Sequence, residues 1–242
     1  VKLLVSAANA VDAPAAMSGG ADIVDAKDPV VGALGPVASD VFREIRAVCG
    51  RRPVTAAIGD ATGEEVVMRT AFEFCEAGAR FVKLGFAGIG QPSRVSALLS
   101  AAVQGIRASS NCSAGVIAVA YADADRVRAM APERVRDVAI RLGVVEGVLI
   151  DTAAKDGPGI CQILGGSALA DWVRSVREAG LLAAVAGKVT ADDLGFVRES
   201  GADVAGVRGA ACRYGRLSPV ESDLVIALRK RCQPHLPERI GV

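Results

Sequence analysis

Short apolar runs alternate with longer amphipathic segments from one end of the chain to the other. The runs are rich in Val, Ile, Ala and Leu without strict alternation, which is typical of strands buried on both faces of a parallel sheet. We predict strands at Lys2–Ser6, Asp22–Ala26, Val54–Ile58, Phe81–Gly85, Val116–Ala120, Gly147–Asp151, Leu182–Ala186 and Asp203–Val207. Helical periodicity between them predicts a small helix at Val11–Ser18 and longer helices at Val37–Cys49, Glu64–Ala77, Ser93–Arg107, Pro132–Leu142, Ser167–Ala179, Ala191–Ser200 and Pro219–Arg231.

Many joins between a helix and the next strand contain a glycine, as in Ala77-Gly78-Ala79. Such a glycine can adopt the left-handed conformation that ends a helix. Eight strand–helix units in 242 residues match a (β/α)8 barrel. An open doubly wound sheet is the alternative, although no G-x-G-x-x-G motif follows the first strand. Because no linker or change of composition divides the chain, we predict that residues 1–242 form a single-domain α/β protein, a TIM barrel.

The charge balance narrows the classes of partner. The formal net charge is +1, so nothing indicates binding to nucleic acid or to a membrane surface. The sequence holds no apolar run near the roughly 20 residues that a membrane-spanning helix needs. It opens directly on a predicted strand without a signal peptide, so we expect a cytoplasmic protein with a small-molecule substrate.

Cysteine and histidine do not form a recognisable metal or triad motif. The six cysteines lie apart and are predicted to be buried free thiols: Cys49, Cys75, Cys112, Cys161, Cys212 and Cys232. The only histidine, His235, lies in the C-terminal tail. We therefore expect no metal, no cofactor and no Ser-His-Asp triad, and acid–base chemistry must use Asp, Glu, Lys, Tyr or Cys.

Lysine is scarce, since only six of the 28 basic residues are lysines. Arginine almost always stays protonated, whereas burial or a nearby cation can turn a lysine into a neutral nucleophile. Four lysines lie in or just after predicted strands, namely Lys27, Lys83, Lys155 and Lys188. In a barrel these strand ends open onto one mouth, where barrel enzymes carry their chemistry.

The two-residue period of a strand groups these lysines with carboxylates. Ile23, Asp25 and Lys27 share one face, whereas Val24 and Ala26 share the other. By the same count Lys83 and Asp151 point into the barrel mouth if their strand faces are inward. The predicted catalytic cluster is Asp25, Lys27, Lys83, Asp151 and Lys155. The alternative is a set of structural ion pairs that close the barrel.

Neighbouring amines depress one another's pKa, and burial acts in the same direction. Such a cluster can keep one lysine neutral near pH 7, ready to form a Schiff base with a carbonyl, while carboxylates move protons. Glycine-rich turns after the last two strands predict a phosphate site. Its expected ligands are Gly187, Lys188, Arg208, Gly209 and Ala210, and Arg213 is either a further contact or a surface charge.

The connections after the fourth and fifth predicted strands each have two interpretations. The segment Gly85–Gly90 is either a lid over the ligand or a plain connection. Asp123 and Asp125 are interpreted as helix-capping acids rather than catalysts.

Three segments together resemble a known family: Asp25-Ala26-Lys27-Asp28-Pro29, Phe81-Val82-Lys83-Leu84-Gly85, and residues 149–157 with Asp151, Lys155 and a following Asp-Gly. They resemble the (5-formylfuran-3-yl)methyl phosphate synthases, also called 4-(hydroxymethyl)-2-furancarboxaldehyde-phosphate synthases, over essentially the whole chain. The resemblance implies a (β/α)8 barrel that condenses two glyceraldehyde-3-phosphate molecules into the phosphorylated furan aldehyde for a methanofuran-type cofactor.

By the same resemblance, Lys27 is the Schiff-base lysine, and Asp25, Lys83, Asp151 and Lys155 transfer protons or position the substrate. Class I aldolases usually carry the imine lysine on strand six, so Lys155 remains an alternative nucleophile. We expect a carbon–oxygen lyase that acts on triose phosphate and forms a homo-oligomer. The alternatives are a class I aldolase for another phosphorylated sugar and a non-enzymatic protein that binds phosphometabolites or serves assembly.

Overall fold

The computed structural model describes residues 1–111 and 113–233. Within these residues, eight parallel strands close into a barrel in the order of the sequence. They are β1 (Lys2–Ala7), β2 (Ile23–Ala26), β3 (Val54–Asp60), β4 (Phe81–Gly85), β5 (Gly115–Tyr121), β6 (Gly147–Asp151), β7 (Leu182–Val185) and β8 (Val204–Val207). β8 pairs with β1, where Val5 lies opposite Val207, and this pairing closes the sheet. The predicted (β/α)8 barrel is confirmed, and the open doubly wound sheet is wrong.

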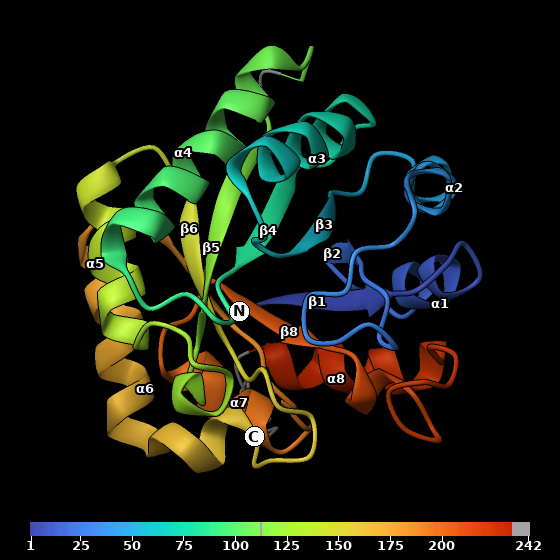
Figure 1. Cartoon of the computed structure of the whole chain (residues 1–242). Helices are drawn as coiled ribbons and strands as arrows, with labels where there is room; N and C mark the ends of the chain where they lie inside the picture. The colour runs from blue at the N-terminus through green and yellow to red at the C-terminus, as the bar shows by residue number, and fades with distance from the viewer. Residues whose placement is uncertain (112, 234–242) are drawn as a thin grey trace.

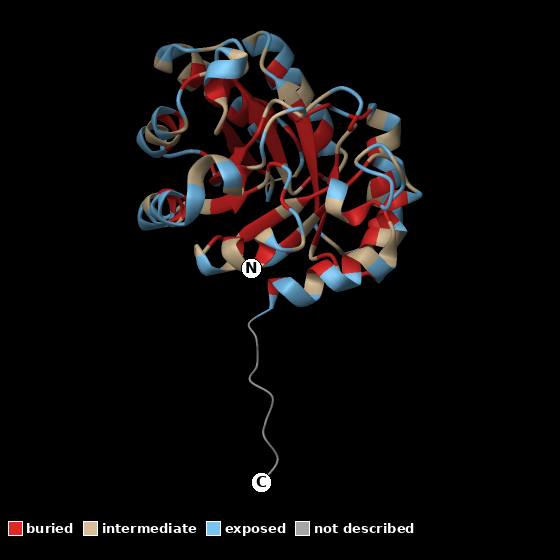
Figure 2. Ribbon diagram, turned by 90° about the horizontal axis from the view of Figure 1, so that it is seen from below, coloured by how far each residue is buried: buried red, intermediate tan, exposed pale blue. Residues whose placement is uncertain are grey.

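Helices surround the barrel on its outside (Figure 1). They are α1 (Asp12–Ser18), α2 (Ser39–Cys49), α3 (Glu64–Glu76), α4 (Pro92–Ala108), α5 (Pro132–Leu142), α6 (Ile160–Glu178), α7 (Asp193–Glu199) and α8 (Ser222–Cys232). Two short 3-10 turns, η1 (Ala124–Val127) and η2 (Gly209–Ala211), follow β5 and β8. Figure 2 shows buried strands and helices whose outer surfaces are exposed. The helices thus cover the outer face of the sheet and leave its inner face for a separate core.

The strands carry two apolar layers, because successive side chains point to opposite faces. Val24 and Ala26 pack outward in the large core between sheet and helices. Ile23, Ile117 and Leu149 belong to the second, smaller core inside the barrel. The prediction that Ile23 and Val24 lie on opposite faces of the strand is confirmed. Polar side chains at the next inward positions therefore enter the barrel above an apolar floor.

Helix α6 differs from its prediction. It begins at Ile160 rather than at Ser167, and its path breaks at Gly165, whose φ is 64° and ψ is −179°. The break hid the first turns from a search for continuous periodicity. Those turns start where Ile160 N donates to Gly187 O at 2.8 Å, and Gln162 Oε1 accepts from Gly159 N at 3.0 Å. Through the bond between Ile160 and Gly187, the connection after β6 contacts the connection after β7.

Among the described residues, no helix has the length and apolar character needed to cross a membrane. Five cysteines are free thiols; Cys161 is half-buried, and the other four are buried, as predicted: Cys49, Cys75, Cys212 and Cys232. Cys112 and His235 lie outside the described residues.

Candidate active site

A cavity of about 590 Å³ occupies the barrel interior and its mouth at the carboxyl ends of the strands. Its floor is apolar and includes Leu4, Ile23 and Leu149. Its upper wall contains every residue predicted for catalysis or phosphate binding: Asp25, Lys27, Lys83, Asp151, Lys155, Gly187, Lys188, Arg208, Gly209 and Ala210. The fold therefore brings together groups that lie as far as 185 residues apart in the sequence.

Asp25 is the most enclosed of these groups, with no exposed surface. Lys83 Nζ lies 2.5 Å from Asp25 Oδ2, Thr55 Oγ1 donates to Oδ1 at 2.6 Å, and Ser6 Oγ donates to Oδ2 at 3.1 Å. The strand register explains the two hydroxyl groups, because Ser6 on β1 and Thr55 on β3 lie directly beside Asp25. Two hydroxyl donors and one lysine cation together offset the burial of this carboxylate.

Lys27 follows the last residue of β2, and its backbone N–H donates to Ala7 O at 3.0 Å. Its side chain opens onto the cavity and is half-buried. Within the described part of the chain, its amine has neither a hydrogen bond nor an ion pair. Burial, followed by repulsion from Lys83, lowers the pKa of Lys27 to about 8, although Asp151 and Asp25 act in the opposite direction.

This pKa changes what Lys27 can do near neutral pH. At a pKa of about 8, roughly one amine in ten is neutral at pH 7, against roughly one in three thousand for an unperturbed lysine. Only the neutral amine attacks a carbonyl. Lys27 thus combines an appreciable neutral fraction, access to the cavity and, in the described part of the chain, no competing protein partner.

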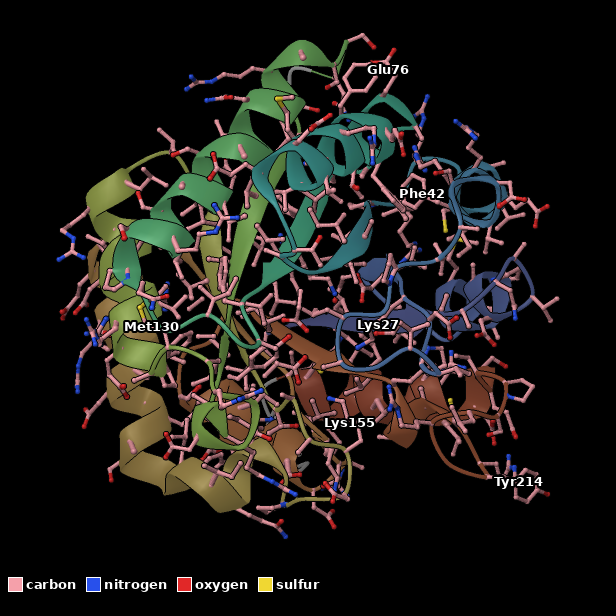
Figure 3. All side chains as sticks on the ribbon, viewed as in Figure 1. Lys27, Phe42, Glu76, Met130, Lys155 and Tyr214 are labelled. Atoms are coloured by element: carbon pink, nitrogen blue, oxygen red, sulfur yellow. The ribbon has the colours of Figure 1, made fainter. Side chains whose placement is uncertain are left out.

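Lys155 presents a different environment, on the segment after β6. Its Nζ donates to Thr152 O at 2.5 Å and lies 3.7 Å from Asp151 Oδ1. Asp151 is buried and also accepts a bond from Thr152 N at 2.7 Å. Lys27 and Lys155, both labelled in Figure 3, follow β2 and β6 and line the same cavity. Lys155 is thus held against a carboxylate, as suits a group that donates and recovers protons.

The segment that carries Lys155 depends on Asp123, whose part in the site was not predicted. The Asp123 carboxylate accepts bonds from Ala153 N and Ala154 N, both at 2.8 Å. It makes no side-chain capping bond to η1, so the predicted helix-capping role of Asp123 is wrong. The prediction failed because the acid lies in the right position for a cap, while its partners lie 30 residues further along the chain.

The connections after β7 and β8 form the opposite wall. Gly187 and Lys188 both have positive φ, 104° and 57°, and Lys188 Nζ donates to Gly157 O. A Cβ on Gly187 would lie 2.9 Å from Thr152 N, so this close approach requires glycine. The backbone turns here and at η2 expose main-chain groups to the cavity, the arrangement that commonly binds phosphate in barrels.

Arg208 lies at the start of the β8 connection and is buried. Four of its five N–H groups donate to protein acceptors at 2.6–2.9 Å: Asp12 Oδ2, Ser6 O, Arg216 O and Ser218 O. One N–H is left for a ligand. Arg213, by contrast, is exposed and pairs with Glu221 and Asp223, so its interpretation as a surface charge fits the structure.

Arg216 is a lining residue that the prediction missed. It is half-buried, and its Nη2 donates to Gly32 O at 2.9 Å. Burial lowers the pKa of Arg216, against the charges of Asp151 and Asp28, which raise it. In a chain so rich in arginine, no local signal distinguishes this one from the surface arginines.

The connection that follows β4, from Phe86 to Gln91, is held by several hydrogen bonds. Ala87 N donates to Asp60 Oδ1 at 2.9 Å, and Gly88 N donates to Val127 O at 2.8 Å. Tyr121 Oη also donates to Asp60 Oδ1, at 2.8 Å. Burial raises the pKa of the Tyr121 phenol, and the charge of Asp60 raises it further. These contacts favour a plain connection over a lid.

The sequence of the chain is similar to a known protein family. A family model described as 4-HFC-P synthase matches residues 3–229. A relative from Kitasatospora aureofaciens is 37% identical over 226 residues, which cover 91% of this chain and 89% of the relative. The (5-formylfuran-3-yl)methyl phosphate synthase of Methanosarcina mazei is 34% identical over 235 residues, covering 96% of this chain and 100% of that protein.

Solved structures share the fold at lower identity. A 3-hexulose-6-phosphate synthase has a TM-score of 0.62 at 22% identity, covering 96% of this chain and 100% of that one. A protein titled KGPDC from Streptococcus mutans has a TM-score of 0.67 at 14% identity, with 96% of both chains covered. These likenesses concern the barrel alone. The family model and the relatives show more, and the chain belongs to the 4-HFC-P synthase family.

Proposed function

We propose that this chain condenses two glyceraldehyde-3-phosphate molecules into 4-(hydroxymethyl)-2-furancarboxaldehyde phosphate through a Schiff base on Lys27. The observation that carries the proposal is the Lys27 amine, which faces the cavity, has no partner among the residues that the structure describes, and has a pKa of about 8. Membership of the family and the names of the relatives support the product. They also support a place in methanofuran-type cofactor biosynthesis and the class of a carbon–oxygen lyase acting on phosphates.

The atoms balance without an oxidant or a reductant. Two triose phosphates contain the atoms of the furan product together with one phosphoric acid and two water molecules. The neutral Lys27 amine adds to one carbonyl and water leaves, giving an imine. Loss of a proton from the neighbouring carbon yields an enamine, which attacks the aldehyde of the second triose. Elimination of phosphate, ring closure, dehydration and hydrolysis of the imine release the furan and restore Lys27.

The other charged residues divide the supporting work. Asp151 and Lys155 form the pair that moves protons, because the Lys155 amine lies 3.7 Å from a carboxylate oxygen at the edge of the cavity. Burial lowers the pKa of Lys27 most, and the positive charge of Lys83, which is held by Asp25, lowers it further. Gly187, Lys188, Gly209 and Ala210 offer backbone groups to a phosphate, with Arg208 contributing at most its remaining N–H.

Borohydride trapping tests the proposal directly. Reduction in the presence of glyceraldehyde-3-phosphate should fix one triose phosphate on Lys27, and mass spectrometry of the digested chain locates the adduct. Without borohydride, the same substrate should yield a product that absorbs in the near ultraviolet, as the furan aldehyde does. An adduct on Lys155 with Lys27 unmodified would overturn the assignment of the nucleophile. An adduct on Lys27 without the furan would favour an ordinary class I aldolase.

A further inference from the structure

Six cationic side chains of the described chain line the cavity, and most of them are already engaged. Three lysines are bonded to protein groups: Lys83 to Asp25, Lys155 to Thr152 O, and Lys188 to Gly157 O. Four N–H groups of Arg208 donate to protein acceptors. Lys27 is the proposed nucleophile. Arg216 is left, with a single hydrogen bond and, among the described residues, no carboxylate within ion-pair distance.

The position of Arg216 is fixed by that one bond. Its Nη2 donates to Gly32 O, in the connection that begins with Lys27. Because β1 lies between β8 and β2 in the barrel, the Arg216 side chain crosses the rim above β1 to reach that connection. The guanidinium thus contacts the connection that follows β2, whereas Gly187 and Lys188 lie on the connection that follows β7.

A half-buried guanidinium without a carboxylate partner is unfavourable unless something compensates its charge. Four of its five N–H groups remain for a ligand, in the planar fork that matches the oxygens of a phosphate. Asp28 and Asp151 contribute attraction only from a distance. The protein thus holds a permanent cation at the cavity wall and leaves its donors open.

The proposed reaction brings two phosphate esters into one cavity. Two dianions repel each other in a partly buried space, so each needs its own positive charge or set of donors. The backbone turns after β7 and β8 offer donors to one of the two phosphate groups. We propose that Arg216 is the principal ligand of a second phosphomonoester site, which holds the other triose phosphate. This inference rests on the proposed function for its substrate, although not for the anion site itself.

Titration with inorganic phosphate tests the site without any turnover. Calorimetry on the intact wild-type chain should give two phosphate ions bound per chain, and Arg216→Gln should bind one. Arg216→Lys, which keeps the charge and loses the fork, should retain the second site with weaker affinity. Arg213→Gln is the matched control, because Arg213 lies on the same connection, is exposed and does not line the cavity. Two ions bound by Arg216→Gln, or only one by the wild type, would overturn the proposal.

Kinetics separate the failure of this inference from failure of the proposed function. Arg216→Gln should still allow borohydride to fix a triose on Lys27, while the KM for glyceraldehyde-3-phosphate in furan formation rises about 10- to 100-fold, as expected for lost bonds to a charged group. An unchanged KM would contradict the role of Arg216 without contradicting the chemistry proposed for Lys27. If the wild type forms neither adduct nor furan, the proposed function fails, and the phosphate stoichiometry alone decides on Arg216.

Discussion

Lys27 and Arg208 line the same cavity, but their positive charges lie in opposite environments. Arg208 is surrounded by acceptors, including the buried Asp12 carboxylate at 2.6 Å. Asp12 in turn accepts bonds from Ala8 N and Val220 N, so the pair joins β1, α1 and the β8 connection. Lys27 faces the same space with neither a hydrogen bond nor an ion pair among the described residues, and its pKa is lowered. A cation with four of its five N–H groups bonded to the protein serves the fold, whereas an unsatisfied one is available for chemistry.

The sharpest test of this contrast is Lys27→Arg, which keeps the charge and removes the nucleophile. We expect furan formation to fall by at least about a thousandfold, because an arginine stays protonated and cannot form the imine. The measurement is the near-ultraviolet absorbance of the product, with Lys230→Arg as the control, since Lys230 lies on α8 away from the cavity. Retained activity would mean that Lys27 acts only as a charge.

Arg208→Gln should have its main effect on stability. It leaves the buried Asp12 carboxylate without its cation, and breaking a buried ion pair typically lowers the free energy of unfolding by about 3–5 kcal/mol. Urea denaturation measures this loss, with Arg213→Gln as the exposed control, for which a much smaller loss is expected because exposed ion pairs contribute little. Equal losses in the two variants would remove the distinction between Arg208 and a surface charge.

Lys27→Met should act in the opposite direction and stabilise the fold. The pKa of Lys27 is about 8 in the folded chain and 10.5 in the unfolded one, so the unfolded state binds the extra proton between these pH values. The wild type therefore carries a penalty of roughly 3 kcal/mol below pH 8, which disappears as the pH rises from 8 to 10.5. Urea denaturation at pH 7 and at pH 10.5 should show a gain for Lys27→Met only at the lower pH. A loss of stability at pH 7 would contradict the unsatisfied state of Lys27.

The smallest expected effect is a shift in pH dependence. The rate of borohydride trapping should rise with pH around the Lys27 pKa of about 8. Asp151→Asn removes a charge that raises this pKa, so the midpoint should move to lower pH. Lys83→Gln removes a charge that lowers the pKa, so the midpoint should move to higher pH. Shifts in the same direction in both variants would contradict the proposed electrostatic origin.

Much of the barrel and part of its cavity could be predicted, because strand alternation is a local property. The two-residue period placed Asp25 and Lys27 with Ile23, and the structure puts all three on the cavity wall. Glycine at helix ends and apolar runs between helices were sufficient to predict the closed parallel sheet. The helix that starts at Ile160 was missed in its first turns because Gly165 interrupts the local pattern.

The sequence by itself therefore determined which side chains enter the barrel, since backbone geometry sets the face on which each lies. Only the tertiary structure decided which charges are paired. Arg208 meets Asp12 across 196 residues, and Arg216 meets Gly32 across 184. These contacts depend on the closure of β8 against β1 and on the conformations of loops, which local sequence does not specify. Within the described residues Lys27 has no partner, because the nearby Asp25 carboxylate is bonded to Lys83, Thr55 and Ser6.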